Sequence, residues 1–211
     1  MKLGKKEFVL DSLFKKGLPP IDDRYGCYFV CGRQGSGKSY FAVFLALRQL
    51  PSKSGKIRIK TNIKSLKLDN NIYDIEYFTD IRVLYNDIEE YCIFIIDEIS
   101  RKYDKNSKTD TQFYAWLNQS RKRKRIVIMI TQEWKELPMW IRRPAKFMFV
   151  TRPTPVLSIF GVYTTSVGDA ENMFLDKETM EWECPVIKKI YYKRNKYIAD
   201  MYDTFEAINM L

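Results

Sequence analysis

The sequence predicts an α/β fold in which a parallel β-sheet carries helices on both faces. Short apolar runs of strand length alternate with segments whose apolar residues recur at helical spacing. Two runs, residues 91–96 and 126–130, are apolar throughout, which is typical of parallel strands covered on both faces. The first run, residues 27–31, leads through a glycine-rich turn into a helical segment. This alternation favours a doubly wound sheet with its ligand crevice at the carboxyl ends of the strands.

The first half of the chain supplies three of the predicted strands. The run CYFVC (27–31) is followed by an expected helix at 39–50, which ends at Pro51 because proline cannot continue a helix. Residues 56–62 alternate apolar and basic side chains, as an outer strand would. The run YCIFII (91–96) predicts a strand that is buried on both faces.

The second half adds a helix and two more strands. Residues 109–125 predict a helix with Asp110 near its N-terminal cap. The side chains expected to face the core are Phe113, Trp116 and Leu117. Further strands are expected at 126–130 (IVIMI) and 146–150 (KFMFV).

The chain length fits one core domain with small additions at its ends. A chain of 211 residues is too short for two domains of ordinary size. We expect an N-terminal lead-in at residues 1–25 and the core at 26–152. The alternation breaks at TRPTP, so residues 153–211 are expected to form a small C-terminal accessory segment.

The composition favours a folded cytoplasmic protein and excludes several kinds of site. Hydrophobic residues make up 45% and charged residues 29%, as in ordinary globular domains. No apolar run approaches the ~18 residues that span a bilayer, and the start lacks a secretory signal, so no membrane association is expected. The four cysteines form no C-x-x-C pair and are expected as buried thiols. The absence of histidine excludes His-based triads and His–metal sites.

The charge balance points to an acidic partner. Lys and Arg total 36 against 26 acidic residues, a net charge of +10. Such an excess favours association with a polyanion, and nucleic acid is the first candidate. A basic surface that only keeps the protein soluble explains the same balance, and charge alone does not separate the two interpretations.

The glycine-rich turn in FVCGRQGSGKSYFAVF (29–44) matches the P-loop pattern G-x-x-x-x-G-K-[ST] in full. Glycines let successive backbone N–H groups converge on phosphate oxygens at the start of a helix. Lys38 is expected to contact the β- and γ-phosphates of ATP, and the Ser39 hydroxyl to bind Mg²⁺. The predicted ATP-binding residues of the turn are Gly32, Arg33, Gln34, Gly35, Ser36, Gly37, Lys38 and Ser39.

Two acidic residues end the apolar strand in CIFIIDEIS. Asp97 is placed like a Walker B carboxylate and is expected to bind ATP-bound Mg²⁺ together with Ser39. Glu98 is expected to orient the attacking water. Such an acidic pair is weak evidence alone, but with a complete P-loop earlier in the chain it predicts an ATPase that converts ATP and water to ADP and phosphate.

The segment IVIMITQEW ends another apolar strand with polar residues. In P-loop ATPases whose catalytic Glu directly follows the Walker B Asp, an additional strand lies between the two motif-bearing strands. Its terminal polar residue senses the γ-phosphate, and Gln132 fits this role. The other interpretation is that Gln132 only caps the next turn.

The additional strand and the acidic pair together predict the RecA-like (ASCE) P-loop fold.

A basic run, SRKRKR, precedes this strand at the expected end of a helix. The helix dipole favours cations there, so a solvated face is the plain explanation. Five successive cations also repel one another, which a polyanion or a neighbouring triphosphate would offset. Arg121 and Arg123 are therefore candidates for an arginine that completes a neighbouring subunit's ATP site, with Arg33 as an alternative within the same chain. The polar, lysine-bearing loop 100–110 is either a DNA-contacting loop or an ordinary connection.

Together the segments GRQGSGKS, IFIIDEIS, SRKRKRIVIMITQ and IADMYDTFE resemble the Zot-like and FtsK/HerA-like ATPases of phages. More narrowly, the chain is similar to the small ATPases that package double-stranded DNA into phage heads. The resemblance covers residues 25 to 152 well and the tail loosely. It implies a homomeric ring, of five subunits in the packaging case, that docks on a portal or procapsid in the host cytoplasm with double-stranded DNA in its pore.

The leading hypothesis is thus an ATP-driven double-stranded DNA translocase that acts as a viral genome-packaging motor. Another phage or plasmid DNA-transfer ATPase with the same core is an alternative. A nucleotide-dependent assembly protein that binds protein and does not translocate DNA is a third possibility. ATP and Mg²⁺ are the expected cofactors in each case.

Overall fold

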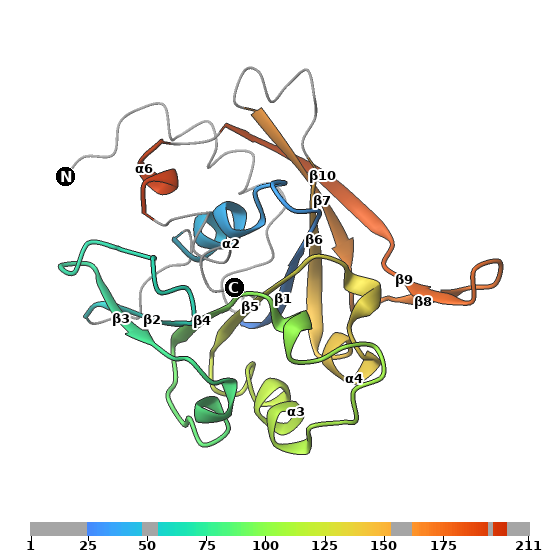
Figure 1. Cartoon of the computed structure of the whole chain (residues 1–211), viewed down its shortest axis with the longest axis horizontal. Helices are drawn as coiled ribbons and strands as arrows, with labels where there is room; N and C mark the ends of the chain where they lie inside the picture. Colours follow the sequence, from blue (N-terminus) through green and yellow to red (C-terminus); the bar gives the residue numbers. More distant parts are fainter. Residues whose placement is uncertain (1–24, 48–54, 153–161, 194–195, 202–211) are drawn as a thin grey trace.

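The computed structural model describes residues 25–47, 55–152, 162–193 and 196–201. Its main feature is an eight-stranded sheet in the order β10-β7-β6-β1-β5-β4-β2-β3 (Figure 1). The first six strands run parallel. Their bounds are Gly26–Cys31 (β1), Ile57–Thr61 (β2), Tyr73–Tyr77 (β3), Cys92–Ile96 (β4), Ile126–Thr131 (β5) and Ala145–Arg152 (β6). The expected N-terminal lead-in lies outside the described residues, apart from its last residue.

The centre of the sheet has the predicted arrangement. Strand β5 lies between β1 and β4, which confirms the additional strand of the RecA-like P-loop fold. Cys31 lies opposite Thr131, and Ile96 lies opposite Met129. The residues that follow these three strands therefore lie together at the carboxyl edge of the sheet.

The prediction of an outer strand at 56–62 is wrong by one place. Strand β3 pairs on the far side of β2, and the side chains of β3 are partly or fully exposed. Strand β2 tolerates its inner position because the ammonium group of Lys60 lies 2.8 Å from the carboxylate of Asp87 and 3.0 Å from that of Glu76. A basic residue in an alternating pattern thus marks a buried ion pair here.

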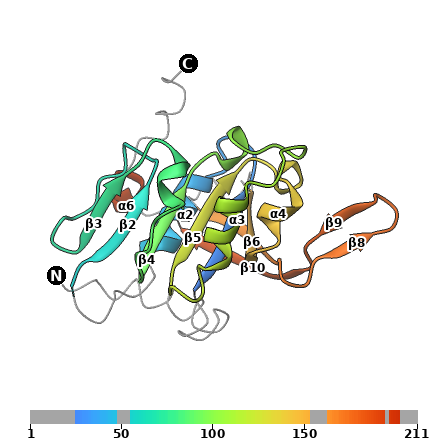
Figure 2. The ribbon, with the colours of Figure 1, turned by 90° about the horizontal axis from the view of Figure 1, so that it is seen from below.

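Helices cover both faces of the sheet, as predicted (Figures 1 and 2). Helix α2, Lys38–Leu47, packs on one face. Helix α3, Thr111–Asn118, helix α4, Met139–Arg142, and the short 3-10 helix η2, Ile81–Leu84, pack on the other. Two further 3-10 turns, η3 (Ile99–Arg101) and η4 (Trp134–Glu136), follow β4 and β5. Among the described residues, no helix is long and apolar enough to cross a bilayer.

Helix α3 is shorter than predicted. Asp110 caps its N-terminus as expected, since its carboxylate accepts a hydrogen bond from the backbone N–H of Phe113 at 3.1 Å. The helix stops at Asn118, and the Ser120 hydroxyl donates to the carbonyl of Leu117 at 2.6 Å. Lys124 has a φ of 52°, which no helix accommodates. The basic run therefore lies in turns beyond the helix, where the dipole cannot explain it.

The C-terminal part of the described chain extends the same sheet. Strand β7, Val162–Asp169, pairs antiparallel with β6, and β10, Val186–Lys193, pairs antiparallel with β7. Between them a hairpin of β8, Phe174–Asp176, and β9, Glu181–Glu183, projects from the body of the molecule (Figure 2). The short helix α6, Lys196–Ala199, lies beside α2. The proposed division at residue 152 stays a prediction.

Candidate nucleotide-binding site

The glycine-rich turn connects β1 to α2 at the carboxyl edge of the sheet. Gly35 and Gly37 have φ values of 75° and 84°, a region that favours glycine. Gly32 is required for space as well, because a Cβ atom on it would lie 2.5 Å from the Ser36 hydroxyl and from the Thr151 carbonyl. The three glycines thus allow the turn that the P-loop pattern predicts.

Neighbouring strands hold this turn in place. The backbone N–H of Gly32 donates to the carbonyl of Gln132, at the end of β5, at 3.0 Å. On the other side, the Thr151 hydroxyl donates to the Cys31 carbonyl at 3.1 Å and lies 2.8 Å from the Ser36 hydroxyl. Ser36 and Thr151 are both buried. The sequence did not single out Thr151, and its only signal is that it is a polar residue near the end of an apolar strand.

Lys38 is the first residue of α2, and its ammonium group donates to the carbonyl of Arg33 across the turn at 3.1 Å. Burial lowers the pKa of Lys38, while the nearby Asp97 and Glu98 oppose this shift. The side chains of Arg33 and Gln34 are exposed at the tip of the turn. The turn therefore holds a cation at the N-terminus of α2, where a triphosphate would also meet backbone N–H groups.

Ser39 and Asp97 meet although they are far apart in the sequence. The Ser39 hydroxyl donates to the Asp97 carboxylate at 3.4 Å. Burial, reinforced by the negative charge of Glu98, raises the pKa of Asp97 to about 6. A hydroxyl beside a buried carboxylate offers the hard oxygen donors that Mg²⁺ prefers. These two residues therefore fit the magnesium site that the sequence predicts.

Asn62 fixes the backbone of Asp97. Its amide nitrogen donates to the Asp97 carbonyl at 3.0 Å, and its amide oxygen accepts from the Asp97 N–H at 2.7 Å. Asn62 follows β2, the strand beside β4. Sequence reasoning missed this residue, although a polar residue directly after a strand was the available signal. The two bonds hold the Walker B turn to the neighbouring strand.

Glu98 lies beside Asp97 with its backbone in the left-handed region, at a φ of 52°. Its N–H donates to the Asp97 carboxylate at 2.8 Å, and its own carboxylate forms an ion pair with Arg101. Gln132 lies at the same edge, next to Gly32, with an exposed side chain. The structure thus brings the P-loop, the acidic pair and Gln132 together, and their individual roles stay predictions.

The basic run lies at the opposite, amino edge of the sheet. A Cβ atom on Gly26, at the start of β1, would lie 3.4 Å from the Arg121 guanidinium. The six residues of β1 span about 20 Å between this point and the P-loop. Arg121 and Arg123 therefore do not join the ATP site of their own chain.

Contacts within the fold also offset much of the repulsion among the positive charges of this run. The Arg125 side chain is fully buried and donates to the carbonyls of Glu89 and Asp87 at 2.7 and 2.6 Å. It also lies 3.1 Å from the Asp87 carboxylate. Arg121 forms an ion pair with Glu171, and Arg123 donates to the carbonyl of Ile88 at 2.7 Å. A polyanion is therefore not needed to explain these cations.

Comparisons with known proteins agree with this geometry. Residues 28–152, more than half of the 211-residue chain, match the ATPase family associated with various cellular activities (AAA). None of the curated proteins matches the chain. Among solved structures, the N-terminal domain of zonular occludens toxin from Neisseria meningitidis has a TM-score of 0.61 at 20% identity, over 84% of this chain and 98% of that one.

The genome packaging NTPase B204 from Sulfolobus turreted icosahedral virus 2, in complex with ATP-gammaS, has a TM-score of 0.50 at 13% identity. The match covers 78% of this chain and 100% of that one. At such identities, the likeness of these structures is a likeness of fold. The family match goes further, because it spans the P-loop, the acidic pair and the strand between them. The chain belongs to the AAA family and is a P-loop ATPase.

Proposed function

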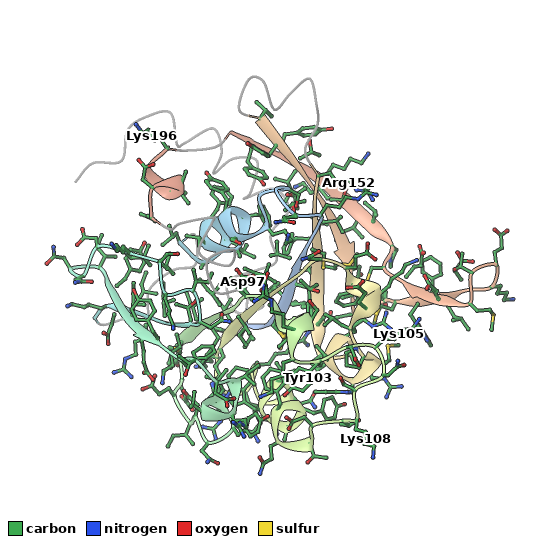
Figure 3. The ribbon with its side chains drawn as sticks, viewed as in Figure 1. Asp97, Tyr103, Lys105, Lys108, Arg152 and Lys196 are labelled. Atoms are coloured by element: carbon green, nitrogen blue, oxygen red, sulfur yellow. The ribbon has the colours of Figure 1, made fainter. Side chains whose placement is uncertain are left out.

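We propose that this ATPase is a double-stranded DNA translocase, a viral genome-packaging motor subunit that acts in a homomeric ring. The observation that carries the proposal is the loop directly after the catalytic acids. Lys105 and Lys108 are exposed on it, and neither forms an ion pair with any residue the structure describes (Figure 3). Lys105 shares a surface pocket with Glu133, Glu136 and Glu181, so Lys108 is the lysine with the fewest acidic neighbours for a phosphate to displace.

The loop is anchored so that it can respond to the ATP site. The buried Tyr103 ring stacks on Phe113, with centroids 5.6 Å apart, and its hydroxyl donates to Asp110 at 2.7 Å. Glu98 and Arg101, at the start of the loop, form the ion pair described above. A change at Glu98 during hydrolysis would therefore act on a short segment between the acid and the Tyr103 anchor. Lys105 and Lys108 lie immediately beyond that anchor.

The chain's own residues have separate tasks in this proposal. Lys38 and the backbone N–H groups of the P-loop bind the triphosphate. Ser39 and Asp97 would hold Mg²⁺, which neutralises phosphate charge when it is bound. Glu98 orients the attacking water, and Gln132 contacts the γ-phosphate from the neighbouring strand.

A ring explains how an arginine from the basic run could take part in hydrolysis. Arg121 and Arg123 are too distant from their own P-loop, so they would act on the site of an adjacent subunit. Arg33 remains the candidate within the same chain, because it is exposed on the P-loop itself. Arginines of this kind accelerate phosphoryl transfer by ~10³–10⁵-fold in systems where they have been measured.

Exposed apolar side chains at the two ends of the molecule support head-to-tail association. The hairpin end exposes Phe174, Leu175, Met180 and Trp182, and Met180 is 70% exposed. The opposite end exposes Ile72, Tyr77, Val83 and Ile88, and Ile88 is 71% exposed. Figures 1 and 2 both show the hairpin and β3 at opposite ends. A contact between two different surfaces of one chain closes into a ring when its rotation allows.

Charge complements these two surfaces. The hairpin segment 174–183 carries four acidic residues and one lysine, and two of the acids, Glu181 and Glu183, form ion pairs with Lys135. At the amino edge of the sheet, Arg123 contacts the carbonyl of Ile88, and the ammonium group of Lys124 lies 2.6 Å from the Tyr91 hydroxyl. The proposed contact therefore places Asp176 and Glu178 of the hairpin against the basic turn. The packaging NTPase B204 and the toxin domain share the fold, so the architecture is compatible with a packaging role.

The test is ATP turnover by the full chain with and without duplex DNA, alongside a mass measurement of the assembled species. We expect duplex DNA to stimulate turnover and Lys105→Ala/Lys108→Ala to abolish the stimulation while basal turnover stays. Lys189→Ala/Lys196→Ala is the matched control, since both lysines are exposed and lie outside the loop and the hairpin. DNA affinity should fall steeply with salt and show little sequence preference. A monomer whose turnover ignores DNA would contradict the proposal.

A second candidate is a nucleotide-dependent assembly ATPase that binds protein, and the exposed apolar hairpin favours it. In that case the hairpin would contact the other protein. Turnover would then ignore DNA, and Trp182→Ser would abolish capture of the protein partner without changing basal turnover. The same pair of measurements separates this candidate from a DNA-transfer or packaging ATPase.

A further inference from the structure

We propose that Tyr163 is the stacking platform for the base of the bound nucleotide. The inference rests on the ATP site described above and is independent of DNA translocation. Tyr163 lies on β7, outside the P-loop motif and both acidic positions. It is half-buried, and its ring carbon lies 3.9 Å from the position that a Cβ atom would take on Gly37.

The sheet order decides on which side of the P-loop the base must lie. Strand β1 has β5 and then β4 on one side, and β6 and then β7 on the other. Asp97, Glu98 and Gln132 follow β4 and β5, so the γ-phosphate end of the nucleotide belongs on that side. The nucleoside end must then lie toward β6 and β7.

Tyr163 lies on the β6 and β7 side of the P-loop, at the carboxyl edge of the sheet and on the face that α2 covers. Because β7 runs antiparallel to β6, the start of β7 lies at the carboxyl edge, where Thr164 pairs with Arg152. The ring packs against the core cluster on the α2 face of the sheet. The Tyr163 ring therefore lies on the same face of the sheet as α2 and close to Gly37, the residue before Lys38.

A stack of aromatic rings supports Tyr163 from behind. Its ring is stacked on Tyr192, with centroids 6.0 Å apart and planes 22° apart. Tyr192 is stacked in turn on Tyr40 of α2, at 5.9 Å and 4°. Tyr192 is 1% exposed and Tyr40 3% exposed, so both are fixed in the core. Among the described residues, Tyr192 is the ring that contacts Tyr163, and the proposal places the base on the opposite face of the Tyr163 ring.

The experiment compares ligands with and without a base. ATP and inorganic tripolyphosphate would each be titrated into the full chain with Mg²⁺, using wild type, Tyr163→Ala and Tyr163→Phe. Loss of one stacking partner should weaken ATP binding roughly tenfold in Tyr163→Ala. Tripolyphosphate binding should not change, and Tyr163→Phe should bind both ligands as wild type does. Tyr191→Ala, at an exposed tyrosine on β10, is the matched control.

Equal losses for ATP and tripolyphosphate would overturn the proposal, because they would indicate that the ring only supports the P-loop. No loss for either ligand would overturn it too. Tyr163→Leu keeps apolar contact with Tyr192 and covers the case in which Tyr163→Ala does not fold. A second readout is the fluorescence of 2-aminopurine riboside triphosphate at saturation, which stacking quenches. Quenching that persists in Tyr163→Leu would also contradict the assignment.

Discussion

The two edges of the central sheet carry charge in opposite ways. At the amino edge, Arg125 is buried and bonded to two carbonyls and a carboxylate, and Arg121 is paired with Glu171. At the carboxyl edge, Lys38 and Asp97 lose hydration without gaining a full set of partners, and both of their pKa values shift toward the neutral form. The longest run of cations in the sequence is thus largely satisfied by the fold, while the shorter motifs leave charges that a ligand would satisfy.

The largest expected effect tests whether the amino edge acts on a neighbour's carboxyl edge. Replacement of the acting arginine, by Arg121→Ala or Arg123→Ala, should reduce ATP turnover by about 10³-fold. Mixing that variant with Lys38→Ala subunits should restore part of the turnover, since some interfaces then combine an intact P-loop with an intact arginine. Lys122→Ala is the control and should keep full activity. Failure to recover activity at any mixing ratio would assign the arginine to its own chain or to a structural role.

Glu98→Gln should reduce turnover by about 10²–10⁴-fold, because a general base contributes that much, while ATP binding persists. Single-turnover kinetics and ATP titration measure the two quantities separately. Glu90→Gln makes the same charge change at the amino end of β4, where Glu90 is exposed, and should leave turnover unchanged. Wild-type turnover in Glu98→Gln would remove this residue from the mechanism.

Arg125→Ala should lower the free energy of unfolding by about 3–5 kcal/mol, because it leaves a cavity and removes the hydrogen bonds to the carbonyls of Glu89 and Asp87, although Lys60 still pairs with the Asp87 carboxylate. Chemical denaturation measures the change. Arg123→Ala, at a half-buried position, should cost only about 1 kcal/mol. If the two variants lose similar amounts of unfolding free energy, the burial of Arg125 does not make it more important for stability than Arg123.

Asp97→Asn should raise the free energy of unfolding, in contrast to Arg125→Ala, by an amount that is smaller and depends on pH. The pKa of Asp97 is raised from 3.8 to about 6 in the folded protein, so this group destabilises the fold as pH rises from 4 through 6. In the absence of nucleotide and Mg²⁺, Asp97→Asn should therefore be more stable than wild type at pH 7, by up to about 3 kcal/mol. The difference should disappear near pH 4. A variant that is less stable at pH 7 would show that the carboxylate is already compensated.

The carboxyl edge was easier to predict from sequence than the amino edge. The P-loop, Asp97 and Glu98 are encoded in short local patterns, and the sheet order follows from the same motifs. Asn62 and Thr151 were missed because their function depends on which strands are neighbours, which no local pattern reveals. The partners of Arg121 and Arg125, at Glu171 and Asp87, are also distant in sequence.

The hydroxyl of Thr151 has a consequence for where this protein can be shortened. It joins the last carbonyl of β1 to Ser36 in the phosphate-binding turn, and it comes from near the very end of the matched ATPase region. A fragment ending at Val150 would keep every familiar motif residue and still lack the tie that steadies the loop. A truncation chosen from the motifs alone would therefore remove part of the structure that supports the phosphate-binding turn.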